Sequence, residues 1–237
     1  MKQLFLIGFR NLIQHKRRTL LLGGAISSVT ALLAFLLCLS AGIHETMLES
    51  ATTLSTGHIN IAGFYKVTAG QSAPVVTQYK KLMEIVHRTL PDLDFTASRG
   101  RGWAKLVSDS GSMQVAIGGI DIANEPGFRK VIKIVEGNLD DLSNPNTVLI
   151  FQQQAKKLEV KVGDNLVISA QTPNGTNNTG DLRVAAVARD VGIMSGWNIY
   201  IPADSLRQFY QINSDATGAV HVYVKDVKKI PQDMALL

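Results

Sequence analysis

The segment TLLLGGAISSVTALLAFLLCLSAGI, residues 19–43, decides the architecture of this chain, because its 25 residues include eight leucines and no charged side chain. A helix rises about 1.5 Å per residue and the hydrocarbon core of a membrane is about 30 Å thick, so the segment spans it with room for tilt. Its small residues leave two interpretations open: one face packs on another membrane helix, or small residues are simply tolerated in a span. The segment predicts one transmembrane helix.

The charges around this segment predict its orientation. Five of the 24 Lys and Arg residues precede it and no acid occurs before Glu45, so the remaining 19 basic residues equal the 19 acidic ones. Positive charge beside a span stays in the cytoplasm, which places the large domain outside. The excess of basic residues therefore belongs to the N-terminal segment and does not indicate a nucleic-acid-binding surface. The residues expected to set the orientation and meet the membrane surface are Lys2, Arg10, Lys16, Arg17 and Arg18.

The residues before the span carry an apolar stripe at helical spacing, from Leu4 to Ile13. This pattern favours a basic amphipathic helix on the inner membrane surface over a merely solvated basic segment. A cleaved signal peptide is the other reading of residues 1–43, but its apolar region would be about 7 to 15 residues long. Cys38 is the only cysteine, so no disulfide forms within the chain, and Leu37 before it disfavours a lipoprotein site.

Helical spacing continues beyond the span. Ile43, Met47, Ala51 and Leu54 are four, four and three residues apart, with polar residues between them. We therefore expect a stalk helix that ends at Gly57 and joins the membrane mechanically to the outer domain. The four apolar residues are the ones expected to transmit motion.

The rest of the chain has the pattern of a mixed α/β domain. Turn residues and apolar spacing predict a hairpin around residues 109–112, a helix over residues 76–90 stopped by Pro91, and a polar loop from Thr172 to Asp181. Val220, Val222 and Val224 alternate with His221, Tyr223 and Lys225 in a last strand. Further strands are expected at residues 58–62, 147–150, 165–170, 182–188 and 198–201, and further helices at residues 151–158 and 203–210.

No motif in the chain carries chemistry. The phosphate-binding loop G-x-x-x-x-G-K-[ST] is missing, and Gly100-Arg101-Gly102 lacks the third glycine of a dinucleotide site. The five histidines are scattered. Glu136, Asp140 and Asp141 are interpreted as an acidic surface turn rather than a metal site.

Four further residues attract attention because of their type. Asp121 and Glu125 are expected to cap the turn that ends at Pro126. Trp103 and Trp197 are interpreted as aromatic residues of the core or its rim in preference to a platform that binds a ligand. We predict no catalytic, cofactor-binding or metal residue.

Six segments, taken in order, resemble permease subunits of ABC transporters of the MacB, LolC/LolE and FtsX type. Residues 9–20, FRNLIQHKRRTL, are similar to the segment before the first membrane helix of that family, and Gly57-His58 opens a strand like that of its outer domain. The other matches are the Lys-Arg-Arg-Thr cluster within residues 9–20, GID at 119–121, VEGNL at 135–139 and LEVKVGD at 158–164. The resemblance covers essentially the whole chain.

The resemblance implies an α+β fold: one transmembrane helix with a helical stalk, then a mixed α/β periplasmic domain carrying a β-rich insertion, Porter/Sabre-like. The segments expected are a cytoplasmic amphipathic basic helix at 1–18, the transmembrane helix at 19–43, the stalk helix at 44–54, a mixed α/β subdomain from 55–130 with 211–237, and a β-rich subdomain at 131–210.

The resemblance also implies a function. Such permeases sit in the bacterial inner membrane as dimers of one chain or of two homologous chains. They couple ATP hydrolysis to periplasmic movements that export or release a substrate, and ATP and Mg are bound by a separate cytoplasmic ATPase subunit. Some engage a periplasmic carrier or adaptor. No enzyme activity or cofactor is expected in this chain itself, and its cargo is left open.

Two departures from the family qualify this function. Family members have three more membrane helices after the outer domain, so the sequence is expected to be the N-terminal part of a permease or one chain of a split one. Residues 172–181 lack the apolar tip expected of lipoprotein-releasing members. The alternative is a single-pass, membrane-anchored periplasmic binding, sensor or adaptor protein.

Overall fold

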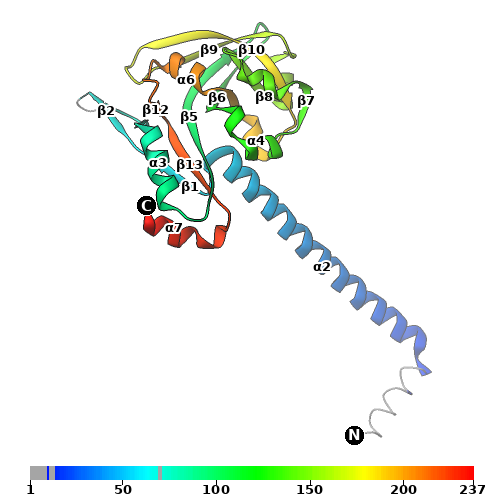
Figure 1. Ribbon diagram of the computed structural model, residues 1–237. Helices are drawn as coiled ribbons and strands as arrows, with labels where there is room; N and C mark the ends of the chain where they lie inside the picture. Colours follow the sequence, from blue (N-terminus) through cyan, green and yellow to red (C-terminus); the bar gives the residue numbers. More distant parts are fainter. Residues whose placement is uncertain (1–9, 11–13, 69–70) are drawn as a thin grey trace. The chain divides into compact units, whose positions relative to one another are not determined.

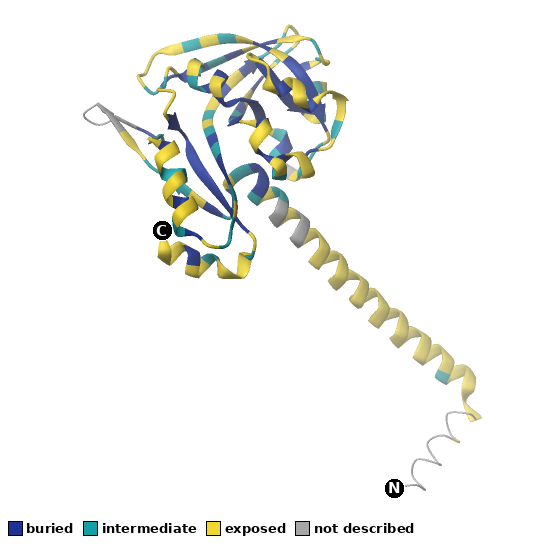
Figure 2. Cartoon of the chain, in the orientation of Figure 1, coloured by how far each residue is buried: buried dark blue, intermediate teal, exposed yellow. Residues whose placement is uncertain are grey.

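The long N-terminal helix is the first element of the computed structural model, which describes residue 10 and residues 14–68 and 71–237 (Figure 1). The chain divides into two compact units, Met1–Glu49 and Ser50–Leu237. Helix α2 (Lys16–Ala51) accounts for most of the first unit, and Lys16–His44 is long and apolar enough to cross a membrane. None of its apolar window is buried (Figure 2). The predicted span, residues 19–43, lies inside this helix.

The predicted stalk changes its helix type before it ends. The α-helix stops at Ala51, and one π-helical turn, η1 (Thr52–Thr56), follows it. Helical structure therefore continues through Leu54, with a change of helix type in its last turn, and Gly57 ends it as predicted. Gly57 has a φ of 69°, a left-handed conformation that favours glycine. An added Cβ there would lie 2.9 Å from Cβ of His221.

The second unit is built on a sheet in which the described residues form nine strands. Their order along the sheet is β1, β13, β5, β6, β11, β8, β10, β7, and β9 pairs with both β10 and β5. Only β6–β11 and β8–β10 are parallel. The strand bounds are β1 Ile59–Ala62, β5 Leu93–Val107, β6 Ser112–Ile120, β7 Ile134–Gly137, β8 Thr147–Phe151, β9 Asn165–Gln171, β10 Asn177–Ala188, β11 Asn198–Pro202 and β13 Ala219–Val224.

These pairings close six strands into a ring, which we call the barrel: β5, β6, β11, β8, β10, β9 and back to β5. Its main core consists of aliphatic side chains from all six strands, among them Leu106, Ile117, Ile150 and Ile168. Closure removes the free edges that an open sheet would expose. The barrel takes β5 and β6 from one predicted subdomain and β8–β11 from the other, and the predicted subdomain boundaries stay a prediction.

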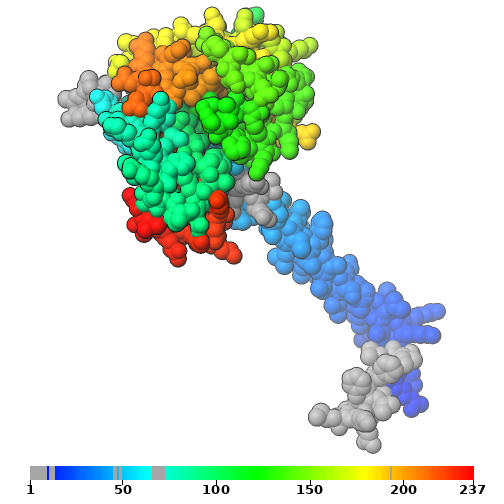
Figure 3. All heavy atoms as spheres, in the orientation of Figure 1, coloured from blue at the N-terminus to red at the C-terminus, as the bar shows by residue number. Residues whose placement is uncertain are grey.

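Smaller elements complete the unit around this sheet. Figure 1 shows α3 beside β1 and β13, and its apolar face packs on Ile59 and Val222. The C-terminal α7 lies against the surface that α3 forms (Figure 3). The remaining bounds are β2 Tyr65–Thr68, β3 Gln71–Ala73, β4 Val76–Thr77, α3 Tyr79–Thr89, α4 Pro126–Val131, α5 Gln152–Leu158, α6 Ala203–Tyr210, β12 Ala216–Thr217 and α7 Ile230–Leu236, with 3-10 turns at Ile122–Asn124, Leu139–Ser143, Gly192–Gly196 and Val227–Lys229.

Most predicted elements are present, and two have other bounds than predicted. The helix predicted over residues 76–90 begins only at Tyr79, because Val76 and Thr77 form β4 and pair with β12. The polar loop predicted from Thr172 to Asp181 is shorter, because β10 starts at Asn177 and pairs with β9. Residues 177–181, four polar residues and one glycine, favour a turn by composition, but their pairing with β9 overrides that preference. The predicted last strand is present as β13, and all six of its residues are buried, His221 and Tyr223 included. The reason is that β13 lies between β1 and β5, with α3 on one face and the residues around η1 on the other.

Candidate functional site

The turn η1 presents backbone carbonyls that need hydrogen-bond donors. The last four carbonyls of a helix have no partner within it, and burying them unpaired is costly. Thr53 and Leu54 are buried. The domain supplies donors to both carbonyls from β5, β11 and β13, and we call these side chains, together with Glu125, the helix anchor.

Arg99 is the centre of the helix anchor. It lies on β5 and is 2% exposed. Its Nη1 donates to the carbonyl of Leu54 at 3.2 Å and its Nη2 to that of Thr53 at 3.0 Å. The same guanidinium forms a two-point ion pair with Glu125, in which Nε donates to Oε1 at 2.7 Å and Nη2 to Oε2. One buried cation therefore binds a carboxylate and two helix carbonyls at once.

Two tyrosines complete the helix anchor. The Tyr200 hydroxyl, on β11, donates to the Leu54 carbonyl at 3.1 Å, and the Tyr223 hydroxyl, on β13, donates to that of Thr53 at 3.3 Å. Burial raises the pKa of each phenol to about 12, so both keep their protons at neutral pH. The Phe128 and Tyr200 rings pack against the guanidinium of Arg99, which shields it from water.

For both Arg99 and Glu125, burial and ion pairing shift the pKa in opposite directions. Burial alone lowers the pKa of Arg99, whereas the Glu125 carboxylate raises it, and the net shift is upward. Burial raises the pKa of the Glu125 carboxyl, which the Arg99 guanidinium offsets only in part. Removing one partner of such a pair leaves the other charge buried without compensation. Both residues are therefore needed for the arrangement to be stable.

A second set of contacts holds the residues at the end of the helix. The Arg101 guanidinium donates from Nη2 to the Ser55 carbonyl and to Nε2 of His221, both at 2.9 Å. His221 is 1% exposed, and burial, with the charges of Arg99 and Arg101, lowers its pKa to about 2. A neutral ring that accepts at Nε2 carries its proton on Nδ1. His221 therefore acts here as an uncharged acceptor.

The residues predicted as functional lie mostly outside this arrangement. Of the predicted stalk residues, Ile43, Met47 and Ala51 are exposed and Leu54 is buried in η1. Among the residues predicted to face the membrane surface, Arg10, Lys16, Arg17 and Arg18 are exposed. Lys2, like most of the predicted amphipathic helix, lies outside the described residues. The roles of both groups stay predictions.

The central residues of the helix anchor were missed or misread. Asp121 does cap a turn, since its carboxylate accepts from the backbone N–H of Ala123. Glu125 makes no capping bond; its expected role was wrong, because its carboxylate turns inward to Arg99. No local pattern marks the pair, whose members are 26 residues apart. The one available signal was two arginines in a strand otherwise rich in glycine and apolar residues.

Metal binding receives no support from the acidic residues that sequence reasoning considered. Asp140 forms an exposed ion pair with Arg129 at 2.6 Å. Within the part of the chain that the structure describes, no three His, Cys, Asp or Glu side chains gather as metal ligands. Trp103 and Trp197 are exposed at the surface, which agrees with the rim alternative of their predicted core-or-rim placement.

Comparison with known proteins identifies the family of this chain. The model of the family described as the MacB-like periplasmic core domain matches residues 19–236. The periplasmic region of MacB from Actinobacillus actinomycetemcomitans is similar in structure, with a TM-score of 0.50 and 16% identity over 80% of this chain and 85% of that one. The extracellular domain of the noncanonic ABC-type transporter YknZ from Gram-positive bacteria gives a TM-score of 0.49 and 13% identity over 73% and 88%. A search of curated proteins found no match. At 16% identity, the likeness to MacB shows the fold alone.

Proposed function

The chain belongs to the MacB-like periplasmic core domain family, and from this premise we propose that it is a permease subunit of a MacB/Lol-type ABC transporter. It contributes the first membrane helix and the outer domain of that permease. A separate cytoplasmic ATPase subunit binds ATP and Mg and performs the hydrolysis. The chain itself is not an enzyme; it converts the state of the ATPase into movement outside the membrane.

The observation that supports this role is the helix anchor. Helix α2 continues without a break to Ala51, and η1 follows it directly. Four hydrogen bonds from Arg99, Tyr200 and Tyr223 hold the carbonyls of Thr53 and Leu54, and outside the helix anchor Arg101 adds a fifth to the Ser55 carbonyl. A turn held this firmly moves together with the strands that bind it. The transmission of movement from the membrane helix to the outer domain requires such an attachment, and a flexible tether would not provide it.

The position in the cell and the partners belong to the same proposal. The cations at residues 10 and 16–18 keep the N-terminus in the cytoplasm, because positive charge resists translocation. The outer domain then faces the periplasm of a bacterium, with the chain in the inner membrane. The functional unit contains two permease subunits, from this chain or from a homologous one, and the outer domain acts on a periplasmic carrier or adaptor.

Breaking the helix between membrane and anchor tests the proposal. Met47→Pro removes a helix hydrogen bond and clashes with the preceding turn, at about 3 kcal/mol or more. In the full permease complex, ATPase binding and hydrolysis should persist. The readout is hydrogen exchange at residues 52–57, measured with and without ATP in a complex whose ATPase binds ATP but does not hydrolyse it. We expect an ATP-dependent change in the wild type and its loss in the proline variant.

Met47→Leu is the matched control, since it keeps apolar volume and helix propensity, and it should respond to ATP like the wild type. An ATP response that survives in Met47→Pro would contradict transmission through this helix. Failure of any ATPase to purify with the wild-type chain would contradict the permease role itself.

A further inference from the structure

Two cavities meet at the segment of β5 that runs from Gly100 to Trp103. The first, of about 380 Å³, lies toward α6 and is lined by Leu206, Arg207 and Tyr210. The second, of about 310 Å³, lies toward η1 and is lined by Leu54, Ser55, Tyr200 and His221. Both volumes are within the range of small-molecule sites.

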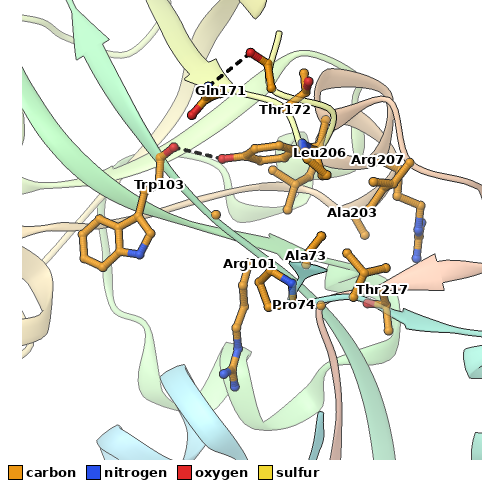
Figure 4. Close-up of a pocket in the computed structure, with 18 residues that line it drawn as sticks. Ala73, Pro74, Arg101, Trp103, Gln171, Thr172, Ala203, Leu206, Arg207 and Thr217 are labelled. Atoms are coloured by element: carbon orange, nitrogen blue, oxygen red, sulfur yellow. Dashed lines mark hydrogen bonds between the residues drawn. The ribbon is translucent and has the colours of Figure 1, made fainter. Parts of the chain in front are cut away.

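The first cavity has no charge free to recognise a ligand. Arg207, its one cation besides Arg101, is occupied by Asp204 at 2.5 Å, by the Ala216 carbonyl and by the Tyr79 hydroxyl. Side chains two residues apart on a strand share a face, and Figure 4 shows Arg101 and Trp103 extending away from Leu206 and Thr172. The charge and the aromatic surface of this region are therefore on the side of the second cavity.

The second cavity has a cation without a counter-charge. Arg99 is compensated by Glu125, whereas the acceptors of Arg101 among the described residues are neutral: the Ser55 carbonyl and the His221 ring. Among the described residues, no carboxylate pairs with Arg101. Burial and the nearby Arg99 charge lower the pKa of Arg101, and it stays protonated at neutral pH because arginine titrates far higher. Among the described side chains, this corner therefore holds one positive charge in excess.

Exposed aromatic surface lies at the mouth of the same cavity. Trp103, which lines it, is 61% exposed and pairs with Trp197, 44% exposed, at 5.8 Å between ring centroids. Two tryptophans left in water beside a cavity provide flat apolar area for a ring. The two bonds of Arg101 use both hydrogens of Nη2, so its Nε–H and Nη1–H groups remain to donate a charge-assisted hydrogen bond to a carboxylate.

We propose that the second cavity binds a small aryl carboxylate, whose carboxylate pairs with Arg101 and whose ring packs on Trp103. The site lies on the outer domain and uses no residue of the predicted membrane helix. Its binding activity goes beyond the transporter role and does not depend on it.

The test is a fluorescence titration of the full chain in detergent. Trp103 and Trp197 are the chain's two tryptophans, so selective tryptophan excitation reports on the site directly. The probe is 4-phenylbutyrate, and its neutral isostere is 4-phenylbutanamide. We expect the carboxylate to bind at least about tenfold more tightly than the amide, as a charge-assisted bond implies.

Two variants test whether Arg101 is the cation that binds the carboxylate of the probe. Arg101→Gln should abolish the preference for the carboxylate. Lys105→Gln, an exposed cation on the same face of the same strand that does not line the cavity, should keep it. Equal affinity of the two probes for the wild type would overturn the proposal, and that comparison needs no variant to fold. Loss of the preference in Lys105→Gln, or equally tight binding of inorganic phosphate, would overturn it too.

Discussion

The barrel and the helix anchor occupy the same unit but are stabilised in different ways. The barrel buries aliphatic side chains from six strands, with Leu106 and Ile150 fully enclosed. The helix anchor buries an ion pair and two hydroxyls around the carbonyls of Thr53 and Leu54. Apolar contacts are non-directional and tolerate small shifts, whereas hydrogen bonds to a carbonyl require one position of the helix end. The barrel provides stability and the helix anchor provides a defined attachment.

Removing the Arg99 cation should have the largest effect on the free energy of unfolding. Arg99→Met leaves the Glu125 carboxylate buried without a partner and should lower the free energy of unfolding by about 3–5 kcal/mol. Urea unfolding of the full chain in detergent measures it. The double variant Arg99→Met/Glu125→Leu should recover much of the loss, because no charge is then buried alone. If the double variant is as unstable as the single one, the stabilisation comes from the hydrogen bonds of Arg99 to the carbonyls of Thr53 and Leu54 and not from the ion pair.

A cavity created in the barrel should lower the free energy of unfolding by slightly less and should produce a different pattern of hydrogen exchange. Leu106→Ala should lower the free energy of unfolding by about 2–5 kcal/mol, and Leu106→Met by less than about 1.5 kcal/mol. Hydrogen exchange separates the two regions: the barrel variant should lose protection throughout the domain, and Arg99→Met first at residues 52–57. Identical exchange patterns in the two variants would remove the distinction between the regions.

The buried histidine should make stability depend on pH. The unfolded chain protonates His221 below about pH 6.5, whereas the folded pKa lies at about 2. The unfolded state therefore binds the proton between these values, and stability, fully present above pH 6.5, falls as the pH falls. The loss should be about 2 kcal/mol between pH 7.5 and pH 5. His58, whose pKa burial also lowers, adds to the slope in wild type and variant alike, so His221→Gln should flatten the pH profile by the His221 share.

Deleting one hydroxyl of the helix anchor should have the smallest effect. Tyr200→Phe keeps the ring contacts with Phe128 and Phe151 but removes one donor to the Leu54 carbonyl. Arg99 still serves that carbonyl, so the loss should be about 1 kcal/mol, visible as a small shift in the urea midpoint. A loss as large as that of Arg99→Met would mean that the hydroxyl, not the cation, is the main donor.

Local patterns were sufficient for the elements whose residues determine their own conformation. The apolar run at 19–43, the helix at 203–210 and the turn at Gly57 follow from spacing and residue type alone. Glu125 was misread because capping is a local role and its true partner, Arg99, is distant in sequence. The strand residues 177–181 were misread because pairing with β9, not their own preference, makes them extended.

The sequence by itself determined the long apolar helix, the mixed α/β class and, through six short motifs, the family, and it predicts an orientation in the membrane. These depend on length, charge and periodicity, which are properties of neighbouring residues. The tertiary structure alone decided that six strands close into a barrel, that Arg99 and Glu125 meet, and that no described carboxylate pairs with Arg101 beside a cavity. The physical reason is that a buried charge selects its partner by proximity in the folded chain, and separation along the sequence carries no record of that proximity.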